Sequence, residues 1–287
     1  MTIGEMHIDF KLELDKTSNL DNPAFEPEEI DAWLNKSIRK FSKTRYSGIN
    51  IKRESFEQTQ KRIDDLRTLV VETDLPCIPG GSKKNCYIAD LDDLEDPYWF
   101  ALSEEVIIAY LSLKDTAEIV APTALVVGST YLVVNDDVVF GEEEDEVTLT
   151  PGTYFIAEDT EHTGDGSVIK VTDSLQGVVQ CTADSYRAHI DNPYSSHILH
   201  YEEASPLRLF IGNIVELITD GSYGVLKYYL RYLRAPAVVD SLSVEQVHCD
   251  LPEHTHDEIV KLAVSMALEN IEQPRYQSHM NEVATME

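Results

Sequence analysis

The 287-residue sequence lacks the features that define several large classes of protein. It contains no run of about eighteen apolar residues, which argues against a helix that crosses a membrane. Its first residues carry neither a basic leader nor an apolar segment, so no signal peptide is expected and the protein should start in a cytoplasm. Its four cysteines show no CxxC spacing, which favours reduced thiols over a disulfide framework.

Catalytic motifs are also missing from the sequence. There is no G-x-S-x-G motif, no glycine-rich loop suited to phosphates and no cysteine in a recognisable active-site context. Carboxylates are so numerous that any one pair of them is uninformative. We therefore expect no enzymatic activity, no catalytic residue and no cofactor.

Basic residues are scarce, with 23 Lys and Arg against 52 Asp and Glu, for a formal net charge of −29. The imbalance is greatest in residues 76–200, which contain 5 basic and 23 acidic side chains. Such a surface disfavours ordinary DNA or RNA binding and docking to anionic lipid. It can face nucleic acid without adhering to it, and the alternative is that the acidity serves solubility alone.

Two kinds of segment in the sequence are rich in residue types that bind metal ions. The densest group of ligand-type residues comprises His248, Cys249, Asp250, His254, His256, Asp257 and Glu258. On a helix, two residues of separation point His254 and His256 in different directions, and no second ligand pair at zinc-finger spacing exists. The acidic stretches 90–96, 142–146 and 158–166 lack the spaced D-x-D-x-D-G pattern of a calcium loop. We predict no metal site.

The most informative stretch is a predicted helix that begins at Pro27 and ends before Gly48. Proline suits the first turn of a helix, and glycine suits the position after its end. Acidic residues occupy the first turn and basic residues the last, as the helix dipole favours. One face is apolar at helical spacing, through Ile30, Trp33, Leu34, Ile38, Phe41 and Tyr46. We predict about four turns.

Three further helices are expected from spacing. Residues 3–15 predict a helix that packs on the helix beginning at Pro27, and residues 55–71 predict a second amphipathic helix, so that the first quarter of the chain is a helical hairpin or bundle. Residues 253–273 carry two apolar faces, which predicts a helix sandwiched between neighbours. Its expected partners are the helix beginning at Pro27 and an adjacent sheet or subunit.

From residue 85 onward the sequence consists of short segments rich in β-branched and aromatic residues, separated by turns, which predicts strands. Residues 206–239 predict two long strands that form a hairpin around the turn at 219–224. The predicted class is α+β, with an N-terminal helical hairpin or bundle packed with a C-terminal helix, an antiparallel β sheet and a small inserted β module. The predicted parts are a helical base (1–75 and 250–273), an antiparallel β region (76–118 and 173–249), an inserted β module (119–172) and a flexible tail (274–287).

Residues 20–48, LDNPAFEPEEIDAWLNKSIRKFSKTRYSG, resemble the N-terminal helix of connector ring or adaptor proteins from short-tailed, crAss-like bacteriophages. Three further segments agree with that pattern and keep its order: DNPY at 191–194, YYLRYLRAPAVV at 228–239 and DLPEHTHDEIVKLAVSMALENIEQPRYQ at 250–277. The module at 119–172 is the part that the resemblance covers least.

The resemblance implies a virion structural protein in the head-to-tail neck, assembled in the cytoplasm of the bacterial host. It implies a closed ring of about twelve subunits below the portal protein, which contacts the next tail component and lets genome DNA pass through its channel without specific binding. No membrane is involved. The candidate contacts to a subunit or to the portal are Arg39, Lys40, Lys43, Arg45, Gln273, Pro274, Arg275, Tyr276 and Gln277.

Two alternatives stay open at this point. The chain could be another phage tail or capsid component, such as a decoration or receptor-contacting protein, in which the module at 119–172 is the working part. It could also be a metal-binding protein or enzyme, although no residue pattern favours that class.

Overall fold

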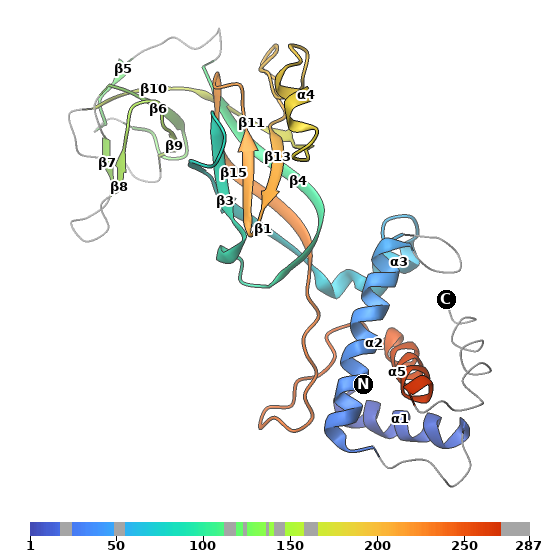
Figure 1. Ribbon diagram of the computed structural model, residues 1–287. Coiled ribbons are helices and arrows are strands. Elements are labelled where there is room, and N and C mark those ends of the chain that lie inside the picture. Colours follow the sequence, from blue (N-terminus) through green and yellow to red (C-terminus); the bar gives the residue numbers. More distant parts are fainter. Residues whose placement is uncertain are drawn as a thin grey trace. The chain divides into compact units, whose positions relative to one another are not determined.

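Helices and mostly antiparallel sheets together build the computed structural model of the chain (Figure 1), which confirms the α+β class. The structure describes residues 1–17, 25–48, 55–111, 119–122, 125–135, 138–140, 147–157 and 166–270. The chain divides into two units. The first, here called the helical unit, combines Met1–Val71 with the chain from Leu233 onward, and the second, the β unit, is Glu72–Tyr232.

The helical unit is organised around its last helix. Its elements are α1 (Ile3–Thr17), α2 (Pro27–Ser47), α3 (Gln60–Leu66) with a 3-10 turn (Arg67–Leu69), and a second 3-10 turn (Glu253–Thr255) that leads into α5 (His256–Asn270). Most of α5 is buried around its circumference, and both α1 and α2 pack on it. The predicted pairing of α2 with the last helix is confirmed, and α1 is its second neighbour.

The ends of α2 follow the local signals in the sequence. Pro27 is the first helical residue, and the backbone N–H of Glu26 donates to the Glu29 carboxylate at 3.0 Å. Gly48 adopts a φ of 69°, the left-handed conformation that glycine tolerates best. The predicted start and end are confirmed, but the 21 residues of α2 make about six turns rather than four.

The helix predicted for residues 55–71 is much shorter in the structure. Residues 56–58 form a turn, α3 begins at Gln60, and Val70 already belongs to strand β1 (Val70–Pro76). Val70 and Val71 matched the helical spacing, yet β-branched side chains also favour a strand. Pairing of β1 with β15, which is distant in the sequence, favours the strand over the helix at these residues.

Two main sheets form the β unit. The first has the strand order β1 (Val70–Pro76), β15 (Tyr223–Arg234), β4 (Tyr98–Tyr110) and β11 (Thr172–Gly177). The second has the order β12 (Val179–Gln180), β13 (Leu207–Ile211), β14 (Ile214–Ile218), β3 (Cys86–Asp90) and β2 (Ile78–Pro79). A short helix, α4 (Tyr186–Ile190), contributes Tyr186 to a buried cluster that includes Leu207, Leu209 and Ile218 of the second sheet.

A buried ion pair joins the two main sheets. Arg208 on β13 donates to Glu104 on β4, with an Nη2–Oε2 distance of 2.7 Å, and the hydroxyl of Tyr228 on β15 donates to the other carboxylate oxygen at 2.6 Å. The rings of Tyr98 and Phe210 also meet between the sheets, with centroids 5.9 Å apart. Residues from both sheets therefore share one interior.

The predicted hairpin at 206–239 is wrong. Strand β14 pairs with β13 and β3, whereas β15 lies between β1 and β4 in the other sheet. The connection at 219–222 therefore carries the chain from one sheet to the other. Its turn chemistry is the same as in a hairpin, with Gly221 at a φ of 91° and Asp220 accepting from the backbone of Ser222, so local sequence could not distinguish the two.

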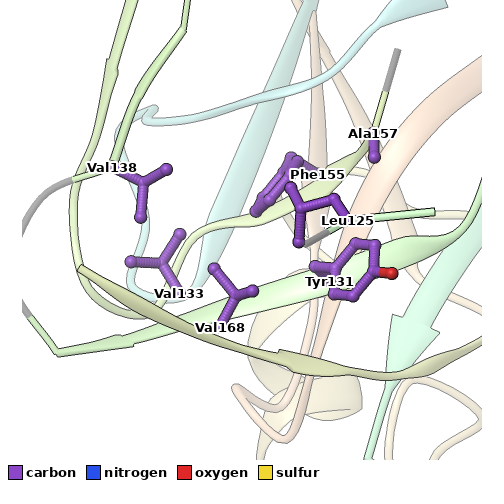
Figure 2. Close-up of a cluster of buried hydrophobic side chains, with 7 residues drawn as sticks. All are labelled: Leu125, Tyr131, Val133, Val138, Phe155, Ala157 and Val168. Atoms are coloured by element: carbon purple, nitrogen blue, oxygen red, sulfur yellow. The ribbon is translucent and has the colours of Figure 1, made fainter. Parts of the chain in front are cut away.

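The inserted segment has its own sheet and core. Its strands follow the order β5 (Ile119–Val120), β10 (Ser167–Lys170), β6 (Thr130–Asn135) and β9 (Tyr154–Ile156), beside the pair β7 (Val138–Phe140) and β8 (Val147–Leu149). Figure 2 shows the seven buried side chains of its core, which come from several of these strands and the loops beside them: Leu125, Tyr131, Val133, Val138, Phe155, Ala157 and Val168.

This module packs on the first main sheet. Leu132, Tyr154 and Ile156 of the module surround a cluster that contains Ala109 and Leu226 of β4 and β15. The ring of Tyr154 lies so close to the backbone of Gly224 that a Cβ at Gly224 would be 2.3 Å from it. Glycine at this position is therefore part of how the module packs on the sheet.

Candidate assembly surfaces

The basic strip predicted on α2 lies on the outer side of the helix. Lys36, Arg39, Lys40 and Lys43 are all exposed and recur at spacings of three or four residues, so they share one face. The apolar face of α2 packs in the opposite direction. We call these four residues the basic strip.

Arg45 does not belong to this strip, because it is buried inside the helical unit. Its Nε lies 3.0 Å from Oδ2 of Asp65 on α3, and its Nη2 donates to Glu258 on α5. The guanidinium also lies over the ring of Phe41, one turn earlier, with its carbon 4.6 Å from the ring centroid. Position 45 follows Phe41 by four residues and so falls on the apolar face. Arg45 joins three helices and is not a surface contact.

Burial of the ion pair between Arg45 and Glu258 also changes the pKa of Glu258. Burial raises the pKa of the Glu258 carboxyl, and the charge and hydrogen bond of Arg45 act in the opposite direction. This arrangement is a structural ion pair. The remaining predicted contacts, at positions 273–277, lie outside the residues that the structure describes.

A second exposed feature is the segment 235–250, which we call the arm. In Figure 1 it extends to the left of α2, whereas α5 lies to the right of that helix. The backbones of Asp240 and Val247 exchange two hydrogen bonds, of 3.2 and 3.0 Å, which close its end into a loop. At that end Leu242 is 59% exposed and Val244 is fully exposed. Large apolar side chains so exposed are typical of a contact surface when they gather in one place.

The arm is held firmly to α2 by polar side chains. Asn35 forms two hydrogen bonds of 2.9 Å with the backbone N–H and C=O of Val239. Asp31 accepts from the backbone N–H and the hydroxyl of Ser241 at 3.0 and 2.7 Å, and its other oxygen lies 2.7 Å from Nε2 of His7. The exposed end of the arm therefore projects from an ordered base.

The histidines of the segment 248–258 each have a different partner in the structure. Nδ1 of His248 accepts from the backbone N–H of Ile3 at 3.2 Å, and His254 lies 3.1 Å from Asp65. His256 donates from Nε2 to the carbonyl of Leu251 at 2.9 Å. Across the described ranges, no group of three His, Cys, Asp or Glu side chains is placed to hold a metal ion.

Three of the four thiols are weaker acids than a free cysteine because they are buried. The four cysteines are free, and burial raises the pKa of Cys77 and Cys86 to about 12 and that of Cys249 to about 11. A thiol with such a pKa is almost entirely protonated at neutral pH and is a poor nucleophile.

The outer face of the sheet β1–β15–β4–β11 carries a hollow of about 840 Å³ lined with acids. Glu105 and Asp173 are exposed there, and the Glu72 carboxylate lies 3.2 Å from Nε of Arg231. Lys227 donates a hydrogen bond of 2.9 Å to the Asp74 carboxylate, and this contact lowers the pKa of Asp74. The hollow is a polar, negatively charged sheet surface.

None of the described helices has the length and apolar character needed to cross a bilayer. Residues 123–278 match the family of phage tail ring proteins 3/4 of crAss-like phages, which is more than half of the chain. The matched segment includes most of the inserted module, the arm and α5. No curated protein matches the chain.

The match defines a structural component of a phage virion. The chain belongs to the phage tail ring protein 3/4 family, which confirms the resemblance to crAss-like ring proteins. The matched range begins after α2, so the N-terminal helices and the basic strip lie outside it. Sequence reasoning found the strip but missed the arm, because residues 235–239 were assigned to a strand and residues up to 249 to the antiparallel β region.

Proposed function

We propose that the chain forms a closed ring in the head-to-tail connector, below the portal protein, where it extends the DNA channel and joins the tail. About twelve subunits pack head-to-tail in this ring. The rings are assembled in the cytoplasm of the bacterial host and become part of the virion neck. Membership of a ring protein family is the observation that carries the proposal.

The acidic surface gives the ring a function towards the genome. The β unit holds most of the excess acid, and its exposed carboxylates include Glu105 and Asp173 on the outer face of the first sheet. If this face lines the channel, it repels the phosphate backbone, so that DNA passes without adhering. A basic lining would hold the DNA instead.

Charge reversal tests this function. Phage that carry Glu105→Lys and Asp173→Lys should eject DNA more slowly in vitro than wild type, whereas the neutral pair Glu105→Gln and Asp173→Asn should have a smaller effect. Reversal of Glu28, an exposed acid on α2, is the control for a general change in charge. Unchanged ejection by the lysine variant would contradict an acidic lining at these positions.

The location of the chain distinguishes this proposal from its rival. Negative-stain images of virions that carry a label on this chain should show the label at the neck. A label at the periphery of the head or tail would favour a decoration or receptor-contacting role, in which the module with the core shown in Figure 2 is the working part.

A further inference from the structure

We infer that the ring contact is made by two outer surfaces of the helical unit: the arm with the basic strip of one copy binds the exposed face of α1 of the next copy. This inference rests on the proposed ring. Each of the two surfaces binds a second copy of this chain, and the side chains named below make that contact specific.

The exposed face of α1 is an apolar stripe between two acids. Ile8 and Leu12 are 59% and 54% exposed, and they lie one turn apart on the same side of the helix. Glu5 precedes Ile8 by three residues and Asp15 follows Leu12 by three, so each end of the stripe carries an exposed carboxylate. The opposite side of α1 is buried through Ile3, Met6, Phe10 and Leu14.

The arm side of the unit has the complementary character. Leu242 and Val244 provide exposed apolar groups, and Arg39 and Lys40 of the basic strip provide exposed cations on the helix that anchors the arm. An apolar stripe between acids thus has a counterpart in the exposed apolar side chains of the arm and the exposed cations on the helix that anchors it. Opposite charges at the edge of an apolar contact fix its register and disfavour other partners.

Within one chain the arm meets α1 through the hydrogen bond from the backbone N–H of Ile3 to Nδ1 of His248. The apolar side chains of the two surfaces, Ile8, Leu12, Leu242 and Val244, all stay exposed, so the two surfaces do not cover each other within one chain. In Figure 1 the arm projects from α2 on the side away from α5. Two different, complementary surfaces on one molecule give a heterologous contact, and such a contact generates a ring when its rotation closes.

The apolar part is tested by single substitutions followed into virions. Leu12→Asp and Val244→Asp change side chains that have few contacts to lose within the chain, so both variants should fold as wild type by circular dichroism. Each should weaken the contact roughly tenfold or more and reduce the number of copies per particle. Val127→Asp is the matched control, because Val127 is 54% exposed in a turn of the inserted module and lies outside both surfaces.

The charged part is tested by a swap. Lys40→Glu and Asp15→Lys should each lower the copy number per virion, and the chain that carries both substitutions should recover towards wild type, because the opposite charges then face each other again. Entry of all single variants at the wild-type copy number, with the label still in a ring at the neck, would overturn this contact and leave the ring standing. A label outside any ring would overturn the proposed function itself.

Discussion

The ion pair between Arg208 and Glu104 should be the largest single polar contribution to the stability of the β unit. Arg208 donates from Nε and Nη2 to one carboxylate oxygen of Glu104, at 3.1 and 2.7 Å, and Tyr228 donates to the other at 2.6 Å. The Arg208 and Glu104 side chains are only 9% and 6% exposed. Burial and the nearby Glu104 charge raise the pKa of Tyr228, so its hydroxyl stays protonated and remains a donor.

Arg208→Met removes both of the arginine's hydrogen bonds and leaves a buried carboxylate with Tyr228. Breaking one partner of a buried pair costs about 3 to 5 kcal/mol. In a unit of this size, a loss of 1 kcal/mol in the free energy of unfolding lowers the transition temperature by about 2 to 4 °C. The transition temperature of the β unit should therefore fall by about 6 to 20 °C in differential scanning calorimetry. The double variant Arg208→Met, Glu104→Gln should lose less stability than Arg208→Met alone, because it leaves no unpaired buried charge.

The chain contains a matched control for this prediction. Arg187 and Asp191 also form an ion pair in the β unit, with an Nε–Oδ2 distance of 3.1 Å, but their side chains are 84% and 62% exposed. Exposed pairs spaced by four residues on a helix contribute about 0.3 to 0.5 kcal/mol, so Arg187→Met should shift the transition by less than about 2 °C. Similar shifts for Arg187→Met and Arg208→Met would refute the reasoning from burial.

Three further predictions follow from other contacts. Gly224→Ala should destabilise the β unit by about 1 to 3 kcal/mol in urea unfolding, because the new methyl group meets the Tyr154 ring, whereas Gly177→Ala, which has open space, should change little. Burial lowers the pKa of His256, so the stability that the neutral imidazole contributes is present above its unfolded pKa of about 6.5 and is lost as the pH falls below that value. The free energy of unfolding, measured in urea, should therefore fall less between about pH 7 and 5 for His256→Gln than for wild type. Asn35→Ala should raise amide hydrogen exchange in the arm while α2 keeps its protection, because the arm loses two hydrogen bonds.

The sequence predicted those features whose signals are local. Pro27 and Gly48 mark the ends of α2 because each acts through its own backbone preference. The two apolar faces of the last helix predicted its central position, because a helix that is apolar on most sides must be covered on most sides. The class of protein was accessible from the resemblance, since its segments were spread along the chain.

Features that depend on distant partners could not be predicted in the same way. The turn at 219–222 has hairpin chemistry, but the partners of β14 and β15 lie in different sheets. Arg45 was assigned to the surface from its charge, although its spacing from Phe41 placed it on the apolar face. The arm has no periodic pattern, because its order comes from Asp31 and Asn35 on another element.

The division of the chain has a consequence for the order of its synthesis. The helices α1 and α2 are made first, residues 72–232 of the β unit follow, and the central helix α5 emerges last. The β unit can fold while the ribosome still holds the rest, whereas the apolar faces of α1 and α2 must wait for α5. If the two outer surfaces of the helical unit make the ring contact, they are not ordered before α5 has left the ribosome. An incomplete chain should then be unable to enter a ring.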